Sequence, residues 1–149
     1  MKHNIVGQQE IWNRLLSIFR RNRIGNAYLF HGPAGSGKEA MAVRFASLLN
    51  CQKPSGSPCF SCPSCSKFDS LQHPNLTIIV PFPRNKVIDK NDPPLKALAP
   101  KTAELLTELM TKKGKDPYIK LELPRANTIL INSIREIKEK VYLKSMESG

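Results

Sequence analysis

The chain has 149 residues, of which 40% are hydrophobic and 23% charged, a usage ordinary for globular proteins. This length and composition exclude a multidomain enzyme, a fibrous repeat and wholesale disorder, so one folded core is expected. The formal net charge of +11 favours polyanionic partners such as nucleic acid or nucleotide phosphates.

The sequence predicts a cytoplasmic protein with no membrane partner. Its longest strongly apolar stretch, residues 76–82, is far shorter than the roughly 20 residues of a membrane-spanning helix. The first five residues lack the continuous apolar region of a secretory signal. Because the cytosol keeps thiols reduced, the four cysteines are expected to bind metal rather than form disulfides.

The first half of the chain predicts a helix, a strand and a second helix. Apolar residues recur at helical spacing over residues 8–23, which indicates an amphipathic helix. Gly25 and Asn26 break this pattern, and the apolar run 27–30 has the length of a buried parallel strand. The apolar residues of 40–49 then predict a helix that packs on a sheet.

The next stretch predicts a stapled loop and a second central strand. Residues 53–66 are rich in Pro, Ser, Gly and Cys, a composition that needs a staple to hold a shape. Residues 76–80 have the pattern of a strand, which Pro81 ends because proline cannot donate to a sheet ladder.

The last third predicts a loop, short strands and two helices. Residues 84–100 resemble a loop, and a short helix over 101–114 is closed by Gly114. Residues 119–123 and 128–131 have the pattern of two short strands. A final helix is expected from Ser133, which forms a capping box with Glu136.

A phosphate-binding loop is the clearest motif. Residues 32–38 match G-x-x-x-x-G-K and lie between a predicted strand and a predicted helix, which is the context that the motif requires. Glycines let backbone N–H groups curl around an anion, the helix N-terminus adds positive partial charge, and the lysine reaches the outer phosphates. The predicted nucleotide-binding residues here are Gly32, Pro33, Ala34, Gly35, Ser36, Gly37, Lys38 and Glu39.

Glu39 departs from the motif, because Ser or Thr at this position would offer a hydroxyl to Mg²⁺. A carboxylate can coordinate magnesium, but it also brings negative charge to a polyphosphate site. The sequence also has no apolar strand that ends in the acidic residue of P-loop hydrolases. We therefore expect bound ATP or ADP with weak or no hydrolysis and no catalytic residue, and we leave Mg²⁺ open. The alternative is a glycine-rich turn without a ligand.

The cysteines form a second motif. Cys51, Cys59, Cys62 and Cys65 are separated by gaps of seven, two and two residues, and such gaps bring thiolates together as structural zinc sites require. Four thiolates complete a tetrahedron, so a bound Zn²⁺ would be structural. An iron–sulfur cluster and unligated thiols are the alternatives. His73, which precedes a proline, is expected in a turn rather than as a ligand.

The order of these features points to a family. Residues 5–8 precede a helix, 27–33 lead into the phosphate loop, 48–51 open the cysteine cluster, 73–75 enter a strand, and 134–136 start the last helix. Over residues 5–82 and about 128–140, this order resembles the N-terminal ATPase domain of bacterial DNA polymerase III clamp-loader subunits, the gamma/tau and delta-prime group of the AAA+ superfamily.

The resemblance implies an α/β fold of the P-loop NTPase (RecA-like, AAA+) type, a three-layer parallel sheet with a small zinc-binding insertion at residues 51–65. It implies that the segment from Ile5 to Gln8, which includes Val6 and Gly7, lies near the adenine of a bound nucleotide. It also implies a hetero-oligomeric ring with other clamp-loader subunits, in which the protein helps load the sliding clamp onto primed DNA. Contact with the DNA itself is expected to be indirect.

Three departures qualify the resemblance. Glu39 is more similar to the delta-prime type, residues 84–125 form an unusually long insertion, and the acidic strand, sensor residues, lid and collar domains are expected beyond Gly149. The chain is thus expected to be an N-terminal portion of such a subunit with an incomplete ATPase site. The alternative is a different class of function: a protein-interaction module that is held together by zinc and whose phosphate loop is vestigial and empty.

Overall fold

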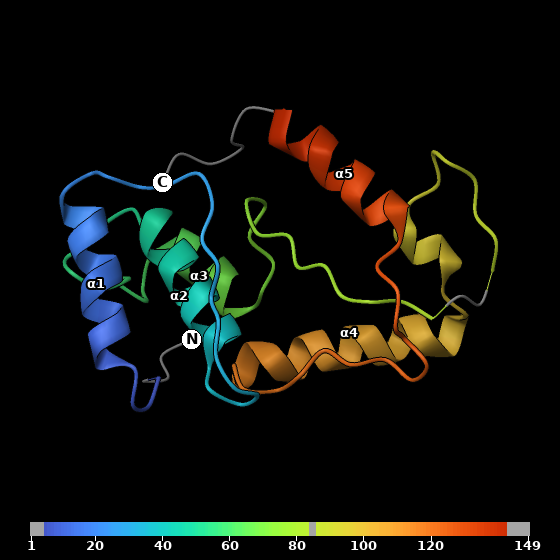
Figure 1. Ribbon diagram of the computed structural model, residues 1–149, viewed down its shortest axis with the longest axis horizontal. Helices are drawn as coiled ribbons and strands as arrows, with labels where there is room; N and C mark the ends of the chain where they lie inside the picture. The colour runs from blue at the N-terminus through green and yellow to red at the C-terminus, as the bar shows by residue number, and fades with distance from the viewer. Residues whose placement is uncertain (1–4, 84–85, 143–149) are drawn as a thin grey trace. The chain divides into compact units, whose positions relative to one another are not determined.

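The computed structural model describes residues 5–83 and 86–142. The described residues form the helices shown in Figure 1: α1 (Gln9–Arg20), α2 (Lys38–Leu49), α3 (Pro63–Asp69), the short 3-10 helix η1 (Pro94–Ala97), α4 (Pro100–Lys115) and α5 (Ile131–Tyr142). The chain divides into two compact units. Among the described residues, unit 1 holds 5–76 and 114–118, and unit 2 holds 77–83, 86–113 and 119–142.

Unit 1 is built on α1 and α2, which pack side by side (Figure 1). Their facing side chains form a buried apolar cluster of Trp12, Leu15, Met41, Phe45 and Leu48. The guanidinium of Arg44 lies 4.4 Å from the centre of the Trp12 ring, which is a cation–π contact. The two helices predicted from apolar spacing are therefore confirmed.

Helix boundaries in unit 1 differ from the predicted ones for local reasons. α1 ends at Arg20 rather than near residue 23, and Asn22 has a φ of +49°, a left-handed conformation that stops a helix. α3 was not predicted, because its residues lie in or beside a loop-like stretch. Pro63 fixes its first turn, and the sulfur of Cys62 accepts a hydrogen bond from the Cys65 N–H as an N-cap.

Unit 2 has an apolar cluster of its own. Phe82, Leu98 and Leu123 form its buried centre, and α4 adds Leu106 and Leu109. α4 is longer than predicted and continues past Gly114, which does not close it. Lys113 lies in a basic stretch of α4, yet its side chain is buried, and its ammonium donates to the Ile119 carbonyl oxygen at 2.6 Å.

The predicted cap of the last helix is wrong. α5 begins at Ile131, so Ser133 lies inside its first turn instead of preceding it. The backbone N–H of Ser133 donates to the Leu130 carbonyl oxygen at 3.0 Å, which is a bond of a turn that has already started. The helix itself is where the sequence predicts it.

The predicted three-layer sheet is absent from the described residues, which form no strand. The runs 27–30, 76–80, 119–123 and 128–130 lie outside helices and strands, although one isolated antiparallel bridge joins Phe82 to Thr128. Ile131, the last residue of the fourth run, is the first residue of α5. An extended segment becomes a strand only when a neighbour pairs with its N–H and C=O groups. An apolar run specifies extended backbone but does not supply that neighbour, so this part of the fold prediction is wrong here.

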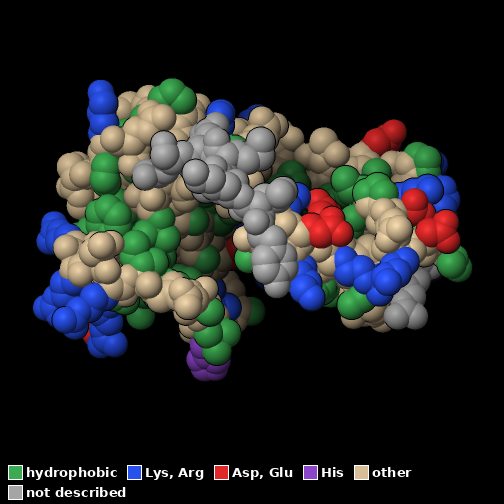
Figure 2. Space-filling model, turned by 90° about the horizontal axis from the view of Figure 1, so that it is seen from above, with side chains coloured by type: hydrophobic (Ala, Val, Ile, Leu, Met, Phe, Trp, Pro, Cys, Tyr) green, Lys and Arg blue, Asp and Glu red, His purple; other side chains and the backbone are tan. Residues whose placement is uncertain are grey.

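The surface reflects the basic composition. Figure 2 shows Lys and Arg side chains in several groups on one face of the molecule, with fewer acidic side chains between them. In unit 1 the only acidic residue between Glu10 and Asp69 is Glu39. Among the described helices, none combines the length and the apolar character that crossing a membrane requires.

Candidate nucleotide and metal sites

The phosphate loop joins an extended segment to the N-terminus of α2. Gly35 and Gly37 have φ values of +78° and +80°, a region that side chains with a Cβ rarely adopt. Gly37 is also the N-cap of α2, and a Cβ placed there would meet the ring of Tyr118 at 3.2 Å. The backbone conformation therefore favours glycine at this position, and a side chain would also crowd the Tyr118 ring.

The loop presents free backbone donors. Within the described part of the chain, the N–H groups of Gly35, Gly37 and Lys38 have no hydrogen-bond acceptor, whereas that of Ser36 donates to the Pro33 carbonyl oxygen at 3.4 Å. Free N–H groups at the first turn of a helix carry positive partial charge. The loop is thus suited to bind an anion.

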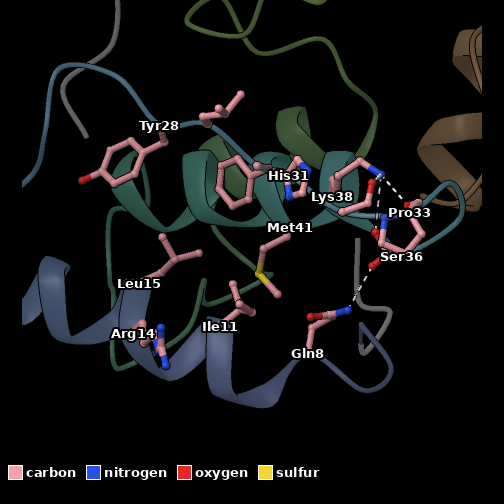
Figure 3. Close-up of a pocket in the computed structure, with 14 residues that line it drawn as sticks. Gln8, Ile11, Arg14, Leu15, Tyr28, His31, Pro33, Ser36, Lys38 and Met41 are labelled. Atoms are coloured by element: carbon pink, nitrogen blue, oxygen red, sulfur yellow. Dashed lines mark hydrogen bonds between the residues drawn. The ribbon is translucent and has the colours of Figure 1, made fainter.

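Lys38 adds a full positive charge at the same place. Its ammonium donates to the carbonyl oxygens of Gly32 at 2.9 Å and Pro33 at 2.6 Å, and lies 3.4 Å from the Ser36 hydroxyl (Figure 3). The side chain therefore folds back over its own loop. Glu39, the next residue, is exposed.

A cavity of about 400 Å³ opens beside the loop. Figure 3 shows side chains from α1, from the extended segment before the loop and from α2 around it. Its apolar lining comes from Ile11, Leu15, Tyr28, Phe30 and Met41, and its polar lining includes Gln8, Arg14, His31 and Lys38. The loop residues Gly32, Pro33, Ser36 and Gly37 complete the wall.

Only some of the nucleotide-binding residues predicted from the sequence line this cavity. Ala34, Gly35 and Glu39 do not line it, although they belong to the loop motif. Val6 is 80% exposed, with its N–H donating to the Tyr118 hydroxyl at 3.2 Å. Ile5 packs against the α1–α2 cluster. Of the segment expected near the adenine, Gln8 lines the cavity, while Ile5, Val6 and Gly7 do not.

Several residues that line the cavity, on α1 and on the extended segment, were not predicted from the sequence. Arg14 and Ile11 lie one turn apart on the helix, and both reach the cavity. The helical spacing that placed Leu15 in the core could have placed these two on the adjoining face. Tyr28 and His31 flank Leu29 and Phe30, and only the fold shows that all four face one space.

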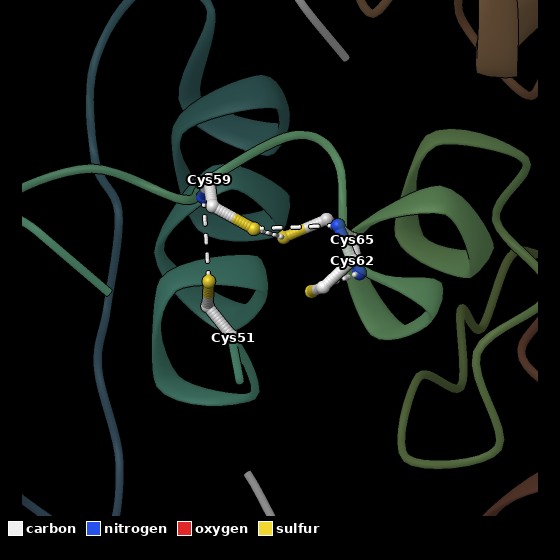
Figure 4. A group of neighbouring side chains, drawn as sticks. All are labelled: Cys51, Cys59, Cys62 and Cys65. Carbon is white, nitrogen blue, oxygen red and sulfur yellow. Dashed lines mark hydrogen bonds between the residues drawn. The ribbon is translucent and has the colours of Figure 1, made fainter. Parts of the chain in front are cut away.

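The four cysteines of the second motif come together in unit 1 (Figure 4). Their sulfur atoms all lie within 4.8 Å of one another, and those of Cys59 and Cys65 are 3.9 Å apart. Tetrahedral zinc with Zn–S bonds of about 2.3 Å needs sulfurs about 3.8 Å apart. The sequence-predicted ligand set is thus assembled at a spacing that fits a metal ion.

Backbone donors surround the sulfurs. The Cys59 N–H donates to the Cys51 sulfur at 3.3 Å, the Cys62 N–H to the Cys59 sulfur at 3.3 Å, and the Cys65 N–H to the Cys62 sulfur at 3.4 Å. Such bonds favour the thiolate over the thiol. The turns that carry the cysteines therefore also favour the negatively charged thiolate form of their side chains.

The sulfurs differ in their readiness to ionise. Hydrogen bonds from the backbone and side chain of Ser61 lower the pKa of Cys59 to about 5. Burial raises the pKa of Cys65 to about 12, despite the Ser47 hydroxyl 3.8 Å from its sulfur. Burial also opposes ionisation of Cys62, but the Cys65 and Gln52 N–H groups bring its pKa below the usual value. A divalent cation would favour the thiolate form of all four.

Comparison with known proteins identifies the family. Residues 7–149 match the family described as "DNA polymerase III, delta subunit", which is nearly the whole chain. The chain belongs to this family. The resemblance to an N-terminal clamp-loader domain, drawn from the order of motifs, is thereby confirmed.

Individual relatives of this delta-subunit family member include two subunits delta' of DNA polymerase III and one plant protein. DNA polymerase III subunit delta' of Bacillus subtilis is 32% identical over 74 residues, which is 50% of this chain and 22% of the relative. The subunit delta' of Pseudomonas aeruginosa is 35% identical over 54% of this chain and 24% of its own length. Protein STICHEL-like 2 of Arabidopsis thaliana is 43% identical over 44% of this chain and 8% of its length.

The matched stretches span less than a quarter of each of these relatives. No solved structure matches the chain.

Proposed function

We propose that this chain is a clamp-loader subunit of DNA polymerase III, of the delta-prime or gamma/tau type, that binds ATP or ADP at the phosphate loop. In this proposal it works in the cytoplasm with related subunits in a ring and helps load the sliding clamp onto primed DNA. Family membership supports the replication role. The loop geometry supports the nucleotide.

The observation that carries the nucleotide proposal is the meeting of charge and free donors at the start of α2. The N–H groups of Gly35, Gly37 and Lys38 lack acceptors within the described residues, and the Lys38 ammonium lies at the same loop. These groups would hold phosphate oxygens, and the ammonium would exchange the Gly32 and Pro33 carbonyls for them. The mostly apolar cavity beside the loop would accept the base.

Hydrolysis is not part of the proposal. Glu39 offers no hydroxyl to Mg²⁺ and adds negative charge beside the phosphates. The chain would therefore bind nucleotide and hydrolyse it weakly or not at all.

We also propose a structural zinc ion in the four-cysteine centre. Residues 51–65 contain few large apolar side chains, so they cannot hold a fold by burial alone. Zinc would supply the charge that keeps all four sulfurs as thiolates and would fix the loop between α2 and α3.

A thermal-shift experiment tests the nucleotide proposal. ADP at 100 times its dissociation constant should stabilise the chain by about 2.7 kcal/mol. Lys38→Ala should lose this stabilisation, whereas Lys53→Ala, which removes an exposed lysine of the cysteine loop, should retain it. If millimolar ADP leaves the melting temperature unchanged, the alternative of an interaction module with an empty loop is favoured instead.

A further inference from the structure

We infer that Ser64 and His73 are positioning residues for the metal: they join the two helix ends beside which three of the cysteines lie, and they keep the His73 ring out of the ligand set. The inference rests on the proposed zinc site. It concerns a hydrogen-bond network in unit 1 whose two central residues, Ser64 and His73, are buried.

Three of the four ligands flank two helix ends, and Cys59 lies in the loop between them. Cys51 lies just beyond the end of α2, after Asn50, the C-cap residue. Cys62 and Cys65 lie at the start of α3, where Cys62 is the N-cap. A metal can be held tightly only if the end of one helix and the start of the other keep a fixed spacing.

Ser64 bridges these helix ends directly. Its hydroxyl donates to the Asn50 carbonyl oxygen at 2.6 Å, and it lies 3.0 Å from Nε2 of His73. Ser64 lies between two ligands on α3, and Asn50 precedes the ligand on the α2 side. The bond therefore ties the backbone next to Cys51 to the turn that holds Cys62 and Cys65.

The hydrogen bonds fix the tautomer of His73. Nδ1 accepts the backbone N–H of Asn75 at 3.1 Å, so the proton of the neutral ring is on Nε2. Nε2 then donates to the Ser64 oxygen, whose own hydrogen points to Asn50. Each donor in this series of hydrogen bonds is thus matched by one acceptor.

The network closes on itself. The Asn75 side-chain amide donates to the Asn50 side-chain oxygen at 2.9 Å, so the chain that leaves Asn50 through Ser64 and His73 returns to it. Ser64 and His73 are each 2% exposed, and the His73 ring stacks on Phe68 with ring centres 4.2 Å apart. Water cannot replace a lost partner of these two side chains without repacking, whereas the bond between Asn75 and Asn50 is exposed.

The same geometry excludes His73 as a ligand. A metal binds a ring nitrogen through its lone pair. The lone pair of Nδ1 faces the Asn75 N–H, and Nε2 carries the proton given to Ser64. Both ring nitrogens of His73 are therefore used in hydrogen bonds. The proposed metal ligands are then the four cysteine sulfurs alone.

Chelator competition and Co²⁺ spectra of the full 149-residue chain test this inference. Ser64→Ala and His73→Leu should each weaken Zn²⁺ affinity about 10-fold or more, the size expected when a partner around the ligands is lost. Their Co²⁺ forms should keep the thiolate-to-cobalt charge-transfer and d–d bands of the wild type. His73→Gln, whose amide can still donate to Ser64, should recover most of the affinity.

Ser66→Ala is the matched control, since Ser66 lies on α3 two residues away and its side chain is exposed. Competition starts from the zinc-loaded chain, so a variant that unfolds only on losing metal still gives an affinity. The inference is overturned if Ser64→Ala binds Zn²⁺ as tightly as Ser66→Ala, or if His73→Leu shifts the cobalt bands as loss of a nitrogen ligand would. A wild-type chain that binds no metal would reject the zinc site and this inference together, whereas metal-loaded variants of unchanged affinity would reject the inference alone.

Discussion

The side-chain amide of Gln8 donates to the carbonyl oxygen of Ser36 at 3.2 Å, joining the segment before α1 to the phosphate loop (Figure 3). The bond is partly buried and bridges 28 residues of sequence. It holds Gln8, which lines the cavity, against the loop that would meet the phosphates.

Gln8→Ala should therefore weaken ADP binding. A neutral hydrogen bond contributes about 0.5–1.5 kcal/mol, so the dissociation constant should rise about 2- to 10-fold. Titration with a fluorescent ADP analogue measures it. Gln9→Ala is the control, because Gln9 pairs with Asn13 on the exposed face of α1. Equal effects of the two substitutions would contradict the role given to Gln8.

Glu39→Thr should strengthen binding of ATP with Mg²⁺. The change removes an exposed negative charge beside the loop and supplies the hydroxyl that the motif offers to the metal. We expect an affinity gain of about 10-fold, equivalent to about 1.4 kcal/mol, seen by calorimetry with Mg²⁺ and lost with EDTA. Glu104→Thr on α4 controls for net charge. A weaker affinity for Glu39→Thr would show that the carboxylate itself assists binding.

Burial in the α1–α2 cluster can be tested by comparing the effect of two leucine substitutions, one buried and one exposed, on the free energy of unfolding. Leu48 is completely buried, so Leu48→Ala should lower the free energy of unfolding by about 2–5 kcal/mol. Leu29 is 94% exposed, so Leu29→Ala should change it by less than about 0.5 kcal/mol. Urea denaturation of the zinc-loaded chain measures both, and similar losses would mean that Leu29 is buried in solution.

Cysteine reactivity in the metal-free chain should follow the ionisation of the sulfurs. With a pKa of about 5, Cys59 is a thiolate at pH 7, whereas Cys65, with a pKa of about 12, stays protonated and buried. Iodoacetamide should therefore label Cys59 well before Cys65, as peptide mass spectrometry would show.

The pH dependence of this labelling has a definite sign. Between pH 6 and 8 the Cys59 rate should stay nearly constant, because its thiolate is already formed. As the pH falls through about 5, protonation should lower the rate. A Cys59 rate that climbs steadily through pH 8 would mean that the Ser61 hydrogen bonds do not hold the thiolate.

Local patterns predicted the parts of this molecule that depend on local physics. The spacing of Leu15 and of the apolar residues of α2 locates the core of unit 1, and the loop motif locates the start of α2. The cysteine spacing predicted that the four sulfurs lie close together, because residues separated by short turns are neighbours in space.

Features that depend on distant partners could not be predicted in this way. The run 27–30 is apolar and extended, but pairing decides whether it is a strand, and no pattern within it specifies a neighbour. The buried state of Lys113 depends on the Ile119 carbonyl, which its own basic surroundings do not indicate. Similarly, the link from His73 to Asn50 passes through Ser64, an unremarkable residue in the sequence.

A crystal structure of the zinc-loaded chain grown with ADP tests the central claim most directly, because it shows where the phosphates bind. The account predicts phosphate oxygens within hydrogen-bond distance of the N–H groups of Gly35, Gly37 and Lys38, with the Lys38 ammonium moved from the Pro33 carbonyl onto a phosphate. A loop that stays as it is at saturating ADP, with the ammonium still on Pro33 and the nucleotide elsewhere or absent, would contradict it.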